Sequence, residues 1–96
     1  MLLSKVREHI NNDAVNPAPY EREYDIVVKI EDMIDQEPNG SEDPKIILKV
    51  TDTSGLLFDV IVPSSLLPRG VKIDSVLRIC KLGKSKEGLD RTLEAK

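Results

Sequence analysis

Lys45–Leu82 has the sequence KIILKVTDTSGLLFDVIVPSSLLPRGVKIDSVLRICKL, and this stretch decides the fold. Apolar and polar residues alternate along it, as they do in strands with one buried face. The alternation is interrupted at Thr53-Ser54-Gly55, ends at Pro63 and Pro68, and resumes at Ser75. This rhythm predicts strand, tight turn, strand, short linker and strand. A small chain with this layout is expected to close into an all-β, five-stranded barrel.

The same alternation predicts the other strands and the face that each one buries. Strands are expected at Tyr24–Met33, Lys45–Thr51, Leu56–Val62 and Val76–Leu82, and a fifth, with weaker alternation, at Leu89–Ala95. The residues expected to face the core are Ile26, Val28, Ile30, Ile46, Leu48, Val50, Phe58, Val60, Val62, Leu77 and Ile79. Apolar residues also fall on the opposite faces, at Val27, Ile47 and Ile61, and Val27 suggests that its face is partly covered.

Residues 1–23 are predicted to form a helix and an extended linker ahead of a barrel domain over residues 24–96. Leu2, Leu3, Val6 and Ile10 have helical spacing, which indicates a short amphipathic helix that ends near Asn11-Asn12 and caps one end of the barrel. Between the third and fourth strands, in the run SSLLP, Ser64 and Ser65 offer an N-cap for one helical turn before Pro68.

Length and composition exclude several classes of protein and of binding site. Ninety-six residues allow one domain. Cys80 is the only cysteine, which excludes an internal disulfide and indicates a reducing compartment, and with a single histidine it disfavours a zinc site. No apolar run approaches the roughly 20 residues of a membrane span, and the N-terminus lacks the pattern of a secretory signal.

The sequence gives little support to catalysis. His9 is far in sequence from Cys80 and from the serines, and no carboxylate pair stands in an acid–base motif. Gly83-Lys84-Ser85 resembles the end of a phosphate-binding loop, but Arg78 occupies the position that such a loop requires to be glycine. The chain is therefore expected not to be an enzyme and to need no metal or cofactor.

The net charge of −3 hides an asymmetry along the chain. Residues 1–44 contain 4 Lys/Arg and 11 Asp/Glu, whereas residues 45–96 contain 10 and 6. The basic half suggests a polyanion partner, and an unevenly charged solvated surface is the alternative. The candidate nucleic-acid contacts are Lys29, Lys49, Arg78, Lys81, Lys84, Lys86, Arg91 and Tyr24. Aromatic residues for base stacking are scarce, since Tyr20, Tyr24 and Phe58 are the only ones and Phe58 is expected in the core.

Three runs, YDIVVKIEDMID, KIILKVTDTSG and VKIDSVLRICKLGKS, resemble an oligonucleotide/oligosaccharide-binding (OB) domain. The strand opening at Tyr24-Asp25, the strand end at Leu48–Thr53 and the strand within Val71–Leu82 are similar to those of the protection-of-telomeres family, particularly the second of its two DNA-binding domains. The resemblance covers residues 20–96. Within it, exposed aromatic residues are nearly missing and the segment between the third and fourth strands is short.

The resemblance implies binding of single-stranded, G-rich telomeric DNA at chromosome ends in the nucleus, beside another OB domain. It implies that Lys29, Lys49, Arg78 and Lys81 contact the backbone or bases. The alternative is a protein-interaction OB module whose partners are other proteins of a telomeric or nucleic-acid-processing complex. The scarce aromatics, the acidic first half and the apolar residues on wet faces favour this alternative.

Overall fold

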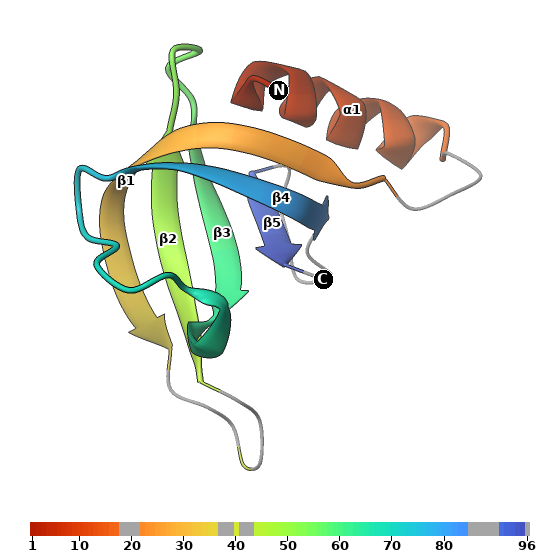
Figure 1. The fold of residues 1–96 in the computed structure, drawn as a ribbon. Helices are drawn as coiled ribbons and strands as arrows, with labels where there is room; N and C mark the ends of the chain where they lie inside the picture. The colour runs from red at the N-terminus through yellow and green to blue at the C-terminus, as the bar shows by residue number, and fades with distance from the viewer. Residues whose placement is uncertain (18–21, 37–39, 41–43, 85–90, 96) are drawn as a thin grey trace.

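The computed structural model describes residues 1–17, 22–36, 40, 44–84 and 91–95, and within them it contains one helix and five strands (Figure 1). The elements in chain order are α1 (Leu3–Val15), β1 (Tyr24–Gln36), β2 (Lys45–Thr51), β3 (Leu57–Pro63), the 3₁₀ turn η1 (Ser64–Leu66), β4 (Val76–Lys84) and β5 (Thr92–Ala95). The fold expected to be all-β is mostly β, and the predicted five strands, the N-terminal helix and the helical turn between β3 and β4 are confirmed.

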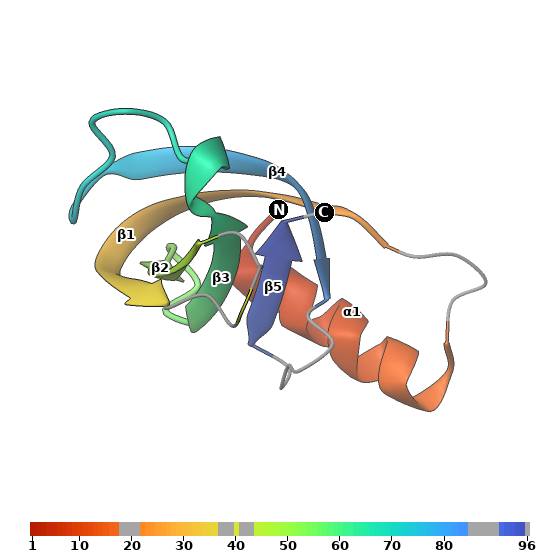
Figure 2. The same ribbon diagram turned by 90° about the horizontal axis from the view of Figure 1, so that it is seen from below.

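The five strands close into a barrel in the order β1-β2-β3-β5-β4. The long β1 makes closure possible, because its first half pairs with β4 and its second half with β2. All pairings are antiparallel except that of β3 with β5, which is parallel over three residue pairs. Figure 2 shows β5 beside β3. Closure leaves fewer open sheet edges, which in other sheets invite unwanted strand pairing.

The barrel interior contains the residues that the alternation predicted. In β1, Ile26, Val28 and Ile30 are buried while the residues between them are exposed. The fully buried core residues of the other strands are Leu48, Val50, Phe58, Val60, Leu82 and Leu93. Val27 lies on the opposite face and is 55% exposed, so the expected cover over that face is absent from the described part of the chain.

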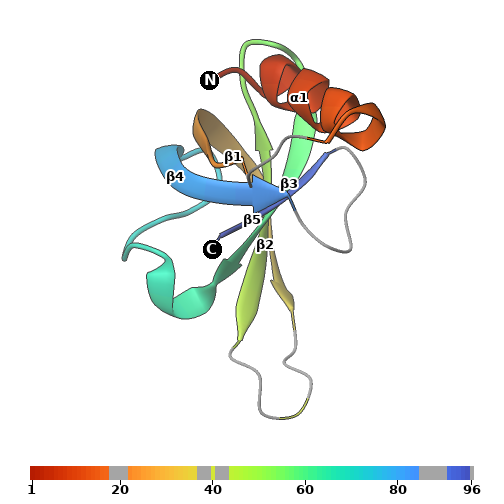
Figure 3. The ribbon, with the colours of Figure 1, turned by 90° about the vertical axis from the view of Figure 1, so that its right-hand side faces the viewer.

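Helix α1 is longer than predicted and is part of the same core. It continues past Asn11-Asn12 to Val15, and its residues Leu3, Val6 and Ile10 are buried in the same cluster as the strand residues. Figure 3 shows α1 at one end of the barrel, beside the hairpin between β2 and β3. The expected role as a cap of the barrel is confirmed. Burial of an apolar stripe, rather than helix propensity, is the usual source of such a helix's stability.

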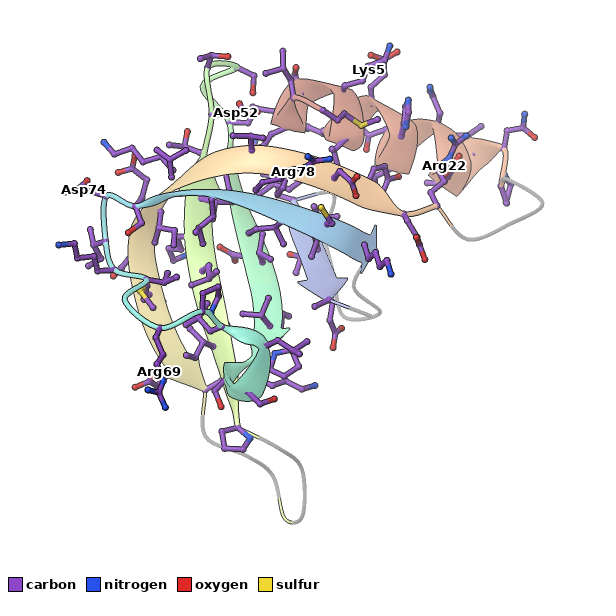
Figure 4. All side chains as sticks on the ribbon, viewed as in Figure 1. Lys5, Arg22, Asp52, Arg69, Asp74 and Arg78 are labelled. Atoms are coloured by element: carbon purple, nitrogen blue, oxygen red, sulfur yellow. The ribbon has the colours of Figure 1, made fainter. Side chains whose placement is uncertain are left out.

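Asp52 joins the β2–β3 hairpin to the start of α1 (Figure 4). Its Oδ2 accepts a hydrogen bond from the backbone N–H of Leu3 at 2.7 Å, and its Oδ1 accepts hydrogen bonds from the backbone N–H and the hydroxyl of Ser54. Leu2 occupies the N-cap position and makes no side-chain capping bond. A carboxylate from a distant segment therefore satisfies one of the free N–H groups of the first helical turn.

Two β-bulges interrupt the regular alternation. In β1, Ile30 pairs with Val50 and Asp32 with Lys49, so Glu31 is an extra residue. In β4, Ile79 pairs with Ile26 and Leu82 with Tyr24, so Cys80 and Lys81 oppose the single residue Asp25. Lys81 has φ 57°, and its N–H donates to Asp25 Oδ1 at 3.2 Å. Each bulge reverses the face to which the following residues point.

The limits of four strands differ from the prediction. β1 extends to Gln36, β3 begins and ends one residue later than expected, β4 extends to Lys84, and β5 begins at Thr92. The proposed serine N-cap of the turn is wrong, because Pro63 occupies that position and makes no side-chain capping bond. A 3₁₀ turn of three residues has few free N–H groups to satisfy, so a cap is dispensable there.

Candidate binding surface

Three of the predicted cationic residues form ion pairs with carboxylates on neighbouring segments. Lys49 Nζ lies 3.1 Å from Asp59 Oδ1 across β2 and β3, and Lys29 Nζ lies 3.4 Å from Asp74 Oδ1. Arg78 Nη2 lies 3.9 Å from Asp25 Oδ2, and Figure 4 shows Arg78 on β4 and Asp74 just before that strand. These cations are therefore distributed over the outer surface as separate pairs, each with its own carboxylate.

The other predicted cationic residues lie on or near β4 and β5 in the sequence, and two of them have no described side chain. Lys81 is exposed at the β4 bulge, beside the Asp25 carboxylate that also pairs with Arg78. Arg91 is exposed just before β5, and its backbone carbonyl accepts a hydrogen bond from Asp59 at 2.8 Å. Lys84 ends β4, but its side chain lies outside the described part of the structure, as does the whole of Lys86.

Tyr24, the aromatic candidate for stacking, is buried between the strands and α1. Its side chain is only 2% exposed, and its ring lies 6.1 Å from that of His9 on the helix, at an interplanar angle of 44°. Burial, with the negative charge of Asp13, raises the pKa of the Tyr24 phenol, and Arg22 opposes this effect. A ring in this position belongs to the core and has no free face for a nucleic-acid base. Phe58, as expected, is also fully buried.

The pairing of Lys49 with Asp59 is expected to contribute little to stability. Both side chains are more than one-third exposed, at 35% and 41%, so solvent screens their attraction. In a double-mutant cycle with Lys49→Ala and Asp59→Ala, measured by urea unfolding, we expect a coupling free energy below about 1 kcal/mol. A coupling above about 2 kcal/mol would show instead that Lys49 is held tightly by this pair, and therefore is poorly available to a ligand.

The outer face of β1, β2 and β3 carries a row of three isoleucines. The strand register aligns Ile34 with Ile47 and Ile47 with Ile61, so the row runs across the strands. Ile34 is 40% exposed, and the other two are partly exposed. None of the three belongs to the buried core cluster or to the residues packed against it. The segment between β3 and β4 lies on the other side of the sheet, where Leu67 and Val71 pack against the core (Figure 3).

Charged residues border the isoleucine row (Ile34, Ile47 and Ile61) on both sides. On one side the register aligns Asp32, Lys49 and Asp59, with Glu31 in the adjoining bulge. On the other side lies Lys45, whose Nζ is 3.4 Å from Glu94 Oε1, and Glu94 itself pairs with Ile61 and so ends the row on β5. Two lysines and four carboxylates give this border a net charge of −2. The lysines pair with Glu94 and Asp59, so the net negative charge comes from Glu31 and Asp32, and the border is acidic around an apolar centre.

Two of the three isoleucines in this row are predictable from alternation. Ile47 and Ile61 were predicted on wet faces, whereas Ile34 was missed because it follows the predicted end of the first strand and because the bulge at Glu31 reverses its direction. Met33 packs against the core. An alternation that restarts with Met33 as an inward residue therefore accounts for the bulge and places Ile34 outward.

Within the described residues no group of three potential metal ligands occurs, and none of their helices is long and apolar enough to cross a membrane. Compared with known proteins, the chain matches no family model, no curated protein and no solved structure.

Proposed function

We propose that the chain is an OB-type barrel. The strand order β1-β2-β3-β5-β4, the parallel pairing of β3 with β5 and the helical turn after β3 support this assignment. In a five-stranded barrel of this type the outer face around the second and third strands commonly serves for binding. That face contains Ile47 and Ile61 here.

Its function, in this proposal, is to bind another protein through the isoleucine row. The main support for this function is that three β-branched apolar side chains lie in register on an outer face without belonging to the core. Contiguous exposed apolar side chains with a polar border are typical of protein-interaction sites. A single-strand DNA site combines a cationic groove with aromatic rings for stacking, whereas here the described tyrosine and phenylalanine rings are buried and three of the candidate cations lie beside carboxylates.

Site-specific photo-crosslinking in living cells tests this proposal. A photoreactive phenylalanine analogue at position 47 is expected to form a covalent adduct with a specific protein, since the row would lie inside the interface. The same analogue at position 27, which also lies on a strand and is more exposed than position 47, serves as the matched control. Loss of the adduct on Ile61→Asp would support the row as the contact. Equal adducts at positions 27 and 47, or none at 47, would refute the proposal.

Binding of single-stranded telomeric DNA is the second candidate function, with the chain acting in the nucleus beside other telomere-complex proteins. The exposed side chains of Lys29 and Arg78, 48% and 70% exposed, favour it, together with Lys81 in the neighbouring bulge. Exposed ion pairs are weak enough for phosphate groups to compete with their carboxylates. This surface on β1 and β4 is distinct from the isoleucine row.

Fluorescence anisotropy with labelled oligonucleotides distinguishes the two candidates. If DNA is the ligand, G-rich telomeric strands bind more tightly than C-rich or mixed strands, and binding weakens as salt is raised. Charge reversal at Arg78, Lys81 or Lys29 should then reduce affinity for every sequence tested. If the partner is a protein, we expect no appreciable binding at low salt. Salt-sensitive binding that the charge reversals leave unchanged would contradict this assignment of contact residues.

A further inference from the structure

We infer that the partner segment seated on the isoleucine row is an amphipathic α-helix with basic flanks, lying across the strands of the barrel. This inference rests on the proposed protein-binding function and specifies the chemistry of the partner. It follows from two properties of the surface: the direction and length of the row, and the sign of the charge around it.

The direction of the row fits a helix. Ile34, Ile47 and Ile61 lie on three neighbouring strands, and strands are about 4.8 Å apart, so the row spans about 10 Å. Apolar residues at positions i and i+7 of a helix are also about 10 Å apart, with one at i+3 or i+4 between them. An extended strand laid along β2 would meet one isoleucine and then the charged residues Lys45 and Lys49 on either side of it.

The charge around the row selects a basic partner. Carboxylates outnumber lysines in the border by four to two, and the two lysines are paired. Glu31 and Asp32 lie at the exposed β1 side of the row and add negative charge where a helix would extend beyond it. Lysine or arginine flanking the apolar positions of the partner would therefore meet complementary charge, which favours association and orientation.

The same charge disfavours a second copy of this chain as the occupant. Two copies related by a two-fold axis would place like patches against each other, because such an interface uses the same surface on both subunits. The acidic border of one copy would then face that of the other, and like charges across an interface are unfavourable. The chain as a whole has the same sign, with a net charge of −3.

Titration of the isotope-labelled full chain with designed peptides, followed by two-dimensional NMR, tests the inference. The probe is a helical peptide of about 18 residues with leucine at i, i+4 and i+7 and lysine on both flanks, long enough for partial helicity in water. Its matched control has glutamate in place of every lysine. We expect the basic peptide to shift the amide signals of Ile34, Ile47 and Ile61, and to bind at least about tenfold more tightly than the acidic one at low salt.

Variants of the chain define the contact. Ile47→Asp should weaken binding of the basic peptide at least about tenfold, and Ile34→Asp provides a second, more exposed position where folding is less at risk. Val27→Asp introduces the same residue at an exposed position on another part of β1 and should change the affinity less than about twofold. The amide spectrum of each variant establishes that it is folded.

Several results would overturn the inference. They are equal binding of the two peptides, signal shifts away from the row, no binding of the basic peptide, and dimerisation of the chain through this face in sedimentation experiments. Failure of the inference is distinguishable from failure of the proposed function. A specific cross-link at position 47 with an acidic or non-helical partner segment would refute the helix and leave the protein-binding function standing.

Discussion

Replacing Val6 by aspartate should unfold the protein or detach its helix, at a cost of at least about 4 kcal/mol. Val6 is fully buried on α1, between Leu3 and Ile10, which belong to the same core cluster. A carboxylate at this position would lose its hydration without gaining a partner. The whole domain is expected to have a stability of about 5–15 kcal/mol, so the loss is a large part of it. Urea unfolding followed by circular dichroism measures the effect.

Ser4→Asp is the matched control for Val6→Asp. It introduces the same residue on the same helix at an exposed position in the first turn, where negative charge interacts favourably with the helix dipole. We expect its stability to be within about 0.5 kcal/mol of the wild type. If Val6→Asp instead unfolds with nearly wild-type stability, α1 is an appendage and does not complete the core.

Local alternation was sufficient to predict the strands whose pairing is regular. β2 has the predicted limits, and β3 differs from them by one residue, because both strands pair with each other without interruption. The turn between them was also predictable, since Gly55 has φ 80° and donates its N–H to the carbonyl of Asp52. Glycine adopts this conformation without the steric cost that other residues have.

The bulges could not be predicted by alternation alone, because alternation assumes one residue per pairing position. Strict alternation after Ile30 places Ile34 inside, and strict alternation after Ile79 places Leu82 outside. The structure shows the reverse in both cases, with Ile34 40% exposed and Leu82 fully buried. The sequence does contain a signal for the second bulge, because alternation assigns the charged residue Lys81 to the core.

The candidate site was harder to predict than the fold, because its properties depend on contacts between distant segments. The cations of the second half of the chain suggested a polyanion site, but the register places Lys49 opposite Asp59, and the closure of the barrel brings Arg78 to Asp25. Tyr24 could not be assigned from sequence, since a tyrosine that opens a strand suits either a binding surface or a core. In the structure α1 packs beside the Tyr24 ring, which is buried in the core.

Replacing Asp52 by alanine should destabilise the protein by about 2–3 kcal/mol, the second-largest effect we expect. The substitution leaves the Leu3 N–H at the start of α1 without its acceptor and removes both hydrogen bonds from Ser54. Ser54→Ala is the matched control on the same hairpin, because it removes one of these bonds and leaves the link to the helix. It should cost about 1 kcal/mol. Equal effects of the two substitutions would show that the link to α1 contributes nothing.

The charge of Asp52 should also make stability depend on pH. Burial raises the pKa of the Asp52 carboxyl, but hydrogen bonds from the Ser54 hydroxyl, the Leu3 N–H and the Ser54 N–H, with the positive charge of the chain's N-terminus, outweigh burial and hold the pKa below its usual value. Since the pKa in the folded state is below that in the unfolded state, about 3.9, the ionised group stabilises the fold above that pH. This contribution is lost as the pH falls through the folded-state pKa.

Asp52→Asn isolates this contribution, because it keeps a side-chain oxygen as acceptor and removes the charge. We expect the difference in free energy of unfolding between the wild type and Asp52→Asn to be constant between about pH 6 and pH 5 and to shrink as the pH falls below about 4. Urea unfolding of both proteins at a series of pH values measures this difference. A difference that stays constant down to the acid limit would mean that the oxygen acceptor alone, and not the ionised carboxylate, joins the hairpin to the helix.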